Sequence, residues 1–343
     1  MQIFIRRQKA DGRRQTADGS RASRTSFDEI SAICFLPSAF CRLLSIVCCL
    51  LSAVCYGAGQ GDAIIAESVR QMAQFNTIRA KIRVDVRVDD QETSLNGSYD
   101  EQVLPDRARA TNDFQRSKFR LELYASVIDE QMMPGSKQNR MITICNPFYD
   151  YSKGILDRQK GKIWKYQSVE GVETIASIRI GVLEDAIKKS SKGQGAINEI
   201  KELGGIAGML NALSDLYNWS DAKETATTWE VQGRMKKAEY DRLLPKFGGL
   251  NKKTKQTPPE MPTDIVIAVN RENYFPNHIQ YLNSPKEQGG ATKTPILQIT
   301  YIDVVLNGDP IPPTHFSTFE DGQIPDGVII RDDTPLAIQK ALQ

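Results

Sequence analysis

The sequence has 343 residues, with 44 lysines and arginines against 42 aspartates and glutamates, so its net charge is only +2. Eight of the basic residues and four of the acidic ones precede residue 59, which leaves residues 59–343 with a net charge of −2. Nucleic-acid binding needs a basic surface, so we exclude nucleic acid as a partner. Residues 59–343 are also numerous enough to bury a core without disulfides, and they contain one cysteine, Cys145.

The N-terminal part of the chain has the features of a signal peptide. The apolar run Leu43–Cys55 follows Arg42 and precedes small and polar residues, as in a secretory leader. We therefore interpret residues 1–58 as a leader, with a start codon assigned too far upstream, and expect an exported, periplasmic protein. The alternative is an inner-membrane anchor formed by uncleaved residues of about 33–55, because a membrane span needs about 20 residues.

After the leader, the sequence predicts a helix followed by strands that are apolar on one side. Residues 62–75 place Ile65, Val69 and Met72 on one helical stripe. Residues 81–88 then alternate charged and apolar side chains, and the same period of two recurs at 118–123, 279–281 and 297–301, with shorter candidates at 163–166, 229–231 and 265–269. Alternation of this kind is typical of antiparallel strands with one wet face.

Helical patterns account for much of the rest. We expect helices within 183–203 and at 206–217, and a short C-terminal helix from Asp333 or Thr334, with Pro335 in its first turn. Residues 248–262 and 287–294 have loop composition. The predicted fold class is α+β: a curved antiparallel β-sheet, or incomplete barrel, with helices covering its concave apolar face. Residues 59–343 would form a single domain with a helical insertion at about 183–244 and a loop at 248–262.

Groups that support catalysis are scarce. The chain has two histidines, His278 and His315, both interpreted as strand-end residues, and Cys145 lies in a strand-like context. Gly204–Gly208 lacks the lysine of a phosphate-binding loop and is interpreted as a helix start. The adjacent acidic residues at 129–130, 320–321 and 332–333 have turn-like surroundings, which indicates solvated carboxylates. We therefore predict no enzymatic activity, cofactor or metal.

Several segments, in order, resemble one family of exported proteins. The first helix and strand, Gly97-Ser98-Tyr99, the Gly161–Tyr166 strand, the strand after Pro276 and the C-terminal Leu297–Phe319 are similar to periplasmic outer-membrane lipoprotein carriers, the LolA-like group. This resemblance implies an apolar cavity under helices that holds acyl chains of lipids or lipoproteins, without catalysis. It also implies two membrane partners: inner-membrane release machinery and an outer-membrane acceptor. The family's arginine that latches the helical lid matches Arg107, Arg109 or Arg120.

The alternating strands supply the candidate cavity residues. They are the inward-facing apolar and aromatic side chains Val84, Val86, Phe119, Leu121, Leu123, Trp164, Tyr166, Ile279, Tyr281, Ile299 and Tyr301. A different function remains open at this point. The same sheet, packed solid by its helices, would act as a non-catalytic scaffold in the cell envelope.

Overall fold

The computed structural model describes most of the chain after residue 58, and these residues belong to one compact unit, Tyr56–Gln343. The described residues are 59–88, 91–104, 117–125, 139–150, 155–157, 160–169, 172–190, 204–250, 257–284, 293–317, 319, 324 and 328–342. The predicted leader and most of the loop at 287–294 lie outside these ranges. No helix within them combines the length and apolar character needed to cross a bilayer.

The described residues include five α-helices and two 3-10 helices. They are α2 (Gln60–Met72), α4 (Ile180–Lys189), α6 (Gly205–Leu216), α7 (Lys237–Leu243), η3 (Leu244–Phe247), η4 (Pro313–Phe316) and α8 (Thr334–Leu342). The predicted C-terminal helix is confirmed, since α8 begins at Thr334 with Pro335 in its first turn. The predicted helices at 62–75 and 206–217 correspond to α2 and α6.

The strands form one large sheet and one short hairpin. In the large sheet they are β1 (Thr77–Val88), β2 (Gln91–Val103), β3 (Ser117–Ala125), β4 (Arg140–Asn146), β7 (Lys162–Val169), β8 (Val172–Arg179), β9 (Tyr217–Trp219), β10 (Lys223–Glu224), β11 (Thr228–Met235), β12 (Asp264–Asn270), β13 (Pro276–Asn283), β14 (Thr294–Leu306) and β15 (Ile329–Asp332). The hairpin pairs β5 (Tyr149–Asp150) with β6 (Ile155–Leu156).

The sheet has 13 strands in the order β10-β11-β12-β13-β14-β1-β2-β3-β4-β7-β8-β15, with β9 beside β11. Every pairing in it is antiparallel except that of β15 with β8. The predicted α+β class is therefore confirmed.

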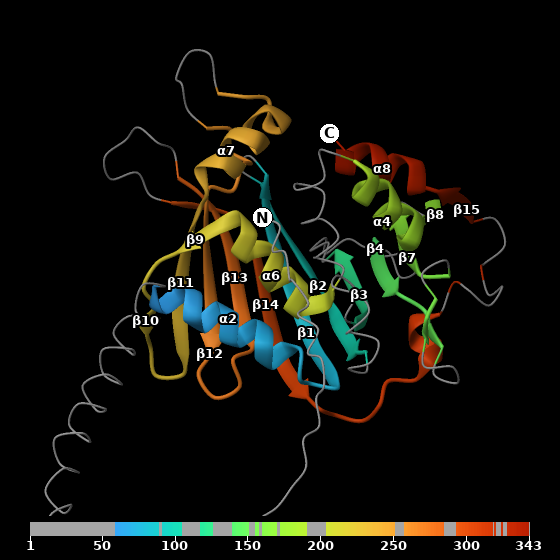
Figure 1. The fold of residues 1–343 in the computed structure, drawn as a ribbon, viewed down its shortest axis with the longest axis horizontal. Helices are drawn as coiled ribbons and strands as arrows, with labels where there is room; N and C mark the ends of the chain where they lie inside the picture. Colours follow the sequence, from blue (N-terminus) through green and yellow to red (C-terminus); the bar gives the residue numbers. More distant parts are fainter. Residues whose placement is uncertain are drawn as a thin grey trace, which may run out of the picture. The chain divides into compact units, whose positions relative to one another are not determined.

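The α-helices cover one face of this sheet. Figure 1 shows α2 and α6 crossing the strands on that face, with α4 beside α8 near β8 and β15. The largest hydrophobic cluster lies under α2 and α6 and includes Ile65, Leu210, Ile267 and Ile279, all fully buried. A second cluster lies under α4, between Cys145, Ile163 and Ile187.

A third cluster lies on the opposite face of β4, β7 and β8. There Ile144 and Ile175 are covered by Ile311 and Phe316, which follow β14 in the chain. We call residues 307–317 together with Phe319 the outer segment. The sheet is thus apolar on both faces at its β4–β8 end.

Residues 183–244, expected to be a helical insertion, contain strands as well as helices. Besides the end of α4 and all of α6 and α7, this range includes β9, β10 and β11. β11 pairs with β12 along Thr228–Arg234, so these residues extend the main sheet. The short predicted strand at 229–231 belongs to this pairing.

Gly61 sets the distance between α2 and the sheet. A Cβ atom at this position would lie 2.0 Å from the Ser220 carbonyl oxygen and 2.9 Å from Val231 Cγ1. We predict that Gly61→Ala lowers the free energy of unfolding by about 1–3 kcal/mol, because overpacking forces the helix outward. Chemical denaturation followed by circular dichroism measures this, with Ala66→Ser, on the exposed side of α2, as the control. Equal stability of Gly61→Ala and wild type would contradict the prediction.

Candidate functional site

The helix-covered face brings together nine of the eleven candidate residues. Strand pairing places Val84 opposite Ile299, Ile279 opposite Ile299, and Tyr281 opposite Leu297, which pairs in turn with Val86. Side chains directly opposite each other lie on one face. The nine residues are Val84, Val86, Phe119, Leu121, Leu123, Ile279, Tyr281, Ile299 and Tyr301, and all belong to the largest cluster or pack against it.

Trp164 and Tyr166 lie on the other face, so the expectation that they share a cavity with the nine is corrected. Ile163, their neighbour, pairs with Cys145 and faces α4, which directs Trp164 away from the helices. The ring of Phe319 lies 6.2 Å from Trp164 and 5.9 Å from Tyr166, stacked on the latter. These two aromatic residues hold the outer segment.

The nine residues differ in burial. Val84, Leu123, Ile279 and Tyr301 are at most 8% exposed, and Tyr301 packs edge-on against Phe275 with ring centroids 5.3 Å apart. This part of the face is a filled core. Tyr99 extends it, 6.0 Å from both Phe119 and Tyr301.

Other apolar side chains on the same face are only partly buried. Six of them, contributed by β1, β2, β3, β13 and β14, form what we call the apolar band: Val86, Leu95, Leu121, Tyr281, Leu297 and Ile299. Beyond it, Met141 pairs with Leu123 and is 41% exposed. The band therefore continues the buried core toward solvent across five neighbouring strands.

Sequence reasoning missed Leu95. The residues of β2, Gln91–Val103, are mostly polar, and Leu95 is the one leucine among them. Its signal is the alternation of Leu95 with Gly97 and Tyr99, which places all three on the helix-covered face beside Val84, Ile82 and Ala80.

A buried carboxylate, also missed, joins α6 to the sheet. Glu101 is 1% exposed; its Oε2 accepts hydrogen bonds from the Tyr99 hydroxyl at 2.7 Å and the Ile206 N–H at 3.1 Å. Ser117 on β3 donates to the Gly204 carbonyl at 3.0 Å. Burial raises the pKa of Glu101, although hydrogen bonds from Ser117, Ile206 and Tyr99 act against the rise.

This carboxylate also explains the glycines at 204–208. Gly205 has φ +71°, and a Cβ there would lie 2.0 Å from Glu101 Oε1. The expected helix start is confirmed, because α6 begins at Gly205. An anion at the start of α6 is already supplied by the protein itself, so these glycines do not form a phosphate site.

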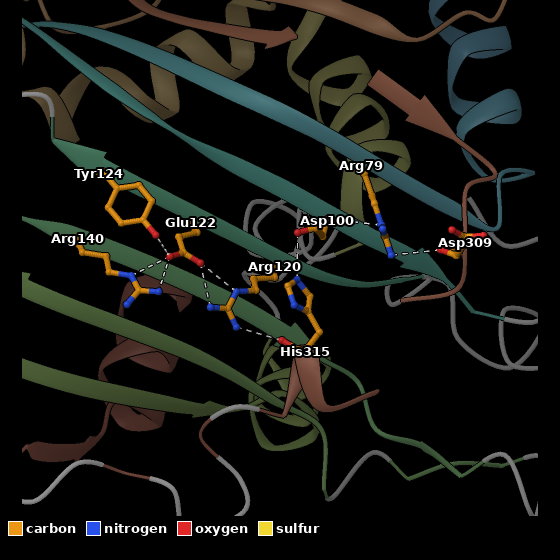
Figure 2. Close-up of polar contacts among 8 residues, drawn as sticks. All are labelled: Arg79, Asp100, Arg120, Glu122, Tyr124, Arg140, Asp309 and His315. Carbon is orange, nitrogen blue, oxygen red and sulfur yellow. Dashed lines mark hydrogen bonds and ion pairs between the residues drawn. The ribbon is translucent and has the colours of Figure 1, made fainter. Parts of the chain in front are cut away.

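Arg120, one of three candidates for a lid-latching arginine, points away from α2 and α6. On the outer face its Nη2 donates to Glu122 Oε2 at 2.9 Å and its Nη1 to the His315 carbonyl at 3.2 Å (Figure 2). Arg107 and Arg109 lie outside the described residues. Among the described residues, Glu101 is the group that ties α6 to β2.

Figure 2 shows how this polar network secures the outer segment. Glu122 also accepts hydrogen bonds from Tyr124 and from Arg140 Nε, the latter at 2.8 Å. His315 Nε2 lies 3.0 Å from Asp100 Oδ2, and Arg79 donates to the Asp309 carbonyl at 3.3 Å. Although burial raises it, the pKa of Glu122 is lowered overall by Tyr124, Arg120 and Arg140. Its contacts are structural, although Arg79 Nε is buried without a hydrogen bond within the described residues.

The candidate nucleophile and bases occupy structural positions. Cys145 is fully buried, which raises the pKa of its thiol to about 12 and leaves it unreactive. His278 Nδ1 lies 3.0 Å from Thr300 Oγ1 within the sheet; burial lowers its pKa, against the charge of Asp85. His315 lies in η4 rather than at a strand end.

The acidic pair at 332–333 also has a structural role. Asp332 Oδ1 accepts the Thr334 N–H at 3.0 Å and so caps α8. The acidic residues at 129–130 and 320–321 lie outside the described ranges. Where the structure describes the chain, no three His, Cys, Asp or Glu side chains are grouped to hold a metal ion.

Comparison with known proteins gives only distant structural neighbours. No family model matches the sequence, and no curated protein matches it. A DUF1329 family protein from Desulfovibrio piger is 9% identical, with a TM-score of 0.32 over 75% of this chain and 97% of that one. A putative outer membrane lipoprotein-sorting protein domain from Vibrio parahaemolyticus is 7% identical, with a TM-score of 0.30 over 75% and 95%. A LolA superfamily protein from Nitrosomonas europaea is 8% identical, with a TM-score of 0.26 over 76% and 98%.

These neighbours include lipoprotein-sorting and LolA superfamily proteins, the group that the sequence resembles. The TM-scores of these three neighbours are below 0.5, so the likeness shows nothing about the function of this protein.

The buried carboxylate generates a pH prediction. Because the folded state raises the pKa of Glu101 above the ordinary 4.5, the folded protein holds this proton more tightly than the unfolded chain. The stability that protonated Glu101 contributes to the fold is therefore present below pH 4.5. It is lost as the pH rises through the pKa of Glu101 in the folded state. We predict that Glu101→Gln, which keeps an acceptor for Ile206, flattens this part of the pH profile measured by urea denaturation.

Glu101→Ala tests the same contact differently. It leaves the Ile206 N–H and the Tyr99 hydroxyl without their acceptor and should cost about 1–3 kcal/mol of stability. Two results together would show that the carboxylate does not hold α6. The stability of wild type and of Glu101→Gln would depend on pH in the same way, and Glu101→Ala would be as stable as wild type.

The outer network gives a further prediction. The side chains of Arg120 and Glu122 are each 10% exposed, so Glu122→Ala leaves a buried guanidinium without its counter-charge and should cost about 3–5 kcal/mol. Lys81→Ala, which removes an exposed pair with Asp303, should cost at most about 1 kcal/mol. Urea denaturation measures both. A similar small loss for the two variants would disprove the structural role of Glu122.

Proposed function

We propose that this protein binds the acyl chains of lipids or lipoproteins on the apolar band and carries them across the periplasm without catalysis. The observation that supports this function is the band itself: six apolar side chains, spread over five neighbouring strands, that are only partly buried on the helix-covered face. Contact between these apolar side chains and water is unfavourable, whereas a bound lipid chain would cover them.

The energetics suit a carrier. Each methylene that leaves water gains about 0.8 kcal/mol, so a chain laid along the band binds through the hydrophobic effect alone. The band also requires no reactive group, in agreement with a buried, unreactive Cys145. Release would come from a change in the helical cover or from a competing membrane partner. The proposed partners are inner-membrane release machinery and an outer-membrane acceptor.

A second candidate function is a non-catalytic envelope scaffold. One observation favours it: Ile302 and Val305 on the outer face of β14 are 44% and 51% exposed. Apolar residues on an open sheet face form a surface for a partner protein. The two candidates thus use opposite faces of the same strand.

β14 allows a matched test. We predict that Leu297→Asp, in the band, abolishes acyl-chain adducts, whereas Ile302→Asp, on the outer face, leaves them in place, because only the first puts a charge where the chain lies. Native mass spectrometry of protein purified gently from the cell envelope measures adducts of acyl-chain mass. Circular dichroism checks that each variant is folded, and Leu297→Ser is the milder replacement if Leu297→Asp is not.

The outcomes separate the two functions. Loss of adducts with Leu297→Asp alone supports the carrier. A wild-type protein that carries and takes up no lipid, but loses a co-purifying protein when Ile302 is replaced, would refute the carrier and support the scaffold.

A further inference from the structure

A cavity of about 250 Å³ lies near the ends of β11 and β12, beside the start of α7. Its lining residues are Arg234, Met235, Lys237, Tyr240, Thr263, Asp264 and Ser284. Met235 and Tyr240 are buried members of the cluster against which the apolar band packs. Through these two residues the cavity adjoins the core of the helix-covered face. Asp264 lies on the opposite side of its strand, because its neighbour Ile265 pairs with Tyr281 of the band.

The lining carries a surplus of positive charge. Arg234 and Lys237 are exposed, and no described side chain forms an ion pair with either of them. The opposing carboxylate, Asp264, is already neutralised: Lys293 Nζ lies 3.1 Å from its Oδ1, and the Thr263 hydroxyl donates to its Oδ2 at 2.9 Å. Two cations are thus left to attract an anion.

Ser284 supplies an unused polar group. Its backbone N–H donates to Thr263 Oγ1 at 2.8 Å, but its own Oγ is buried and makes no hydrogen bond within the described part of the chain. Buried hydroxyls are nearly always paired, so an unpaired one calls for a partner. An oxygen of a bound anion would accept from it.

The frame of the cavity is held in place before any ligand binds. The Asn283 side-chain amide donates to the carbonyls of Pro258 and Met261 at 2.8 and 2.9 Å. The Tyr240 hydroxyl lies 2.8 Å from Thr257 Oγ1. These contacts fix the turn at 258–261 and one wall of the cavity, so little ordering is needed on binding.

We propose that this cavity binds a phosphate group, with Arg234 and Lys237 contacting its oxygens and Ser284 donating to one of them. Guanidinium and ammonium groups form strong charge-assisted hydrogen bonds with phosphate. The volume is below the roughly 300–1,000 Å³ of sites that enclose a drug-sized ligand, so the cavity takes a head group rather than a whole lipid. A lipid head group as the source rests on the proposed function; free phosphate does not.

Three probes distinguish these sources, measured by isothermal titration calorimetry on protein purified from the cell envelope. They are dihexanoyl phosphatidic acid, dihexanoylglycerol, which has the same chains without phosphate, and inorganic phosphate. We expect the phosphatidic acid to bind about tenfold or more tightly than dihexanoylglycerol, since a charge-assisted contact is worth at least 1.4 kcal/mol. The double variant Arg234→Gln/Lys237→Gln should bind the two lipids equally.

Two controls make the test specific. Lys165→Gln/Lys189→Gln removes as many exposed cations from β7 and α4 and should keep the preference for phosphatidic acid. Leu297→Asp should weaken both lipids and leave inorganic phosphate unchanged. Ser284→Ala should weaken phosphate binding a few-fold, because one hydrogen bond is lost.

Each outcome decides one point. Binding of inorganic phosphate that is lost in the Arg234→Gln/Lys237→Gln variant, with no binding of either lipid, supports the phosphate site and refutes the lipid carrier. Equal lipid affinities in the wild type, or a preference retained by the Arg234→Gln/Lys237→Gln variant, would overturn the phosphate site while leaving the band to be judged by Leu297→Asp.

Discussion

The Glu101 carboxylate connects β2 to the first turn of α6 in a part of the protein from which water is excluded. A carboxylate in such surroundings is costly unless its hydrogen bonds are satisfied, and Tyr99 and Ile206 satisfy them. Because the contact needs both partners at fixed positions, it sets where α6 lies on the sheet. α2 packs against α6, so the position of the whole cover above the large cluster follows from it, as does the stretch of sheet that stays uncovered as the apolar band.

The two faces of the sheet have different tasks. On the covered face, successive strands present aliphatic side chains that fill the core and then reach solvent. On the outer face, β3 contributes Arg120 and Glu122. These two residues and the β7 residues Trp164 and Tyr166 hold the outer segment in place. Period-two alternation makes this division possible, because each strand contributes to both faces without any change of backbone. A ligand on one face therefore need not disturb the contacts on the other.

Much of this arrangement could be predicted from the sequence. The remaining features depend on strand pairing and on contacts between distant residues, which the sequence alone does not reveal. The alternation in residues 81–88, 118–123, 279–281 and 297–301 identified the central strands and nine residues of one face. The same alternation in β7 identifies two sets of side chains but not which set faces the helices; Ile163 facing α4 decides it, so Trp164 and Tyr166 were misplaced. β2 has little apolar pattern, which hid Leu95, and Glu101 gains its meaning only from the distant Gly205. The strands β9 and β10, and all of β11 but residues 229–231, were obscured by the helical composition around them.

The central position of β1 has a kinetic consequence. One of its two neighbours, β2, follows at once, but the other, β14, is near the end of the chain, and the Asn76 N–H bonds to the Asn307 side chain 231 residues away. Contacts between residues so far apart in the sequence are slow to form. Until the last strands emerge, one edge of β1 stays unpaired and its apolar side uncovered, a state prone to aggregation. A newly made chain would thus be most vulnerable to aggregation until β14 has been made. A chaperone that holds unfolded chains would contribute most during this interval.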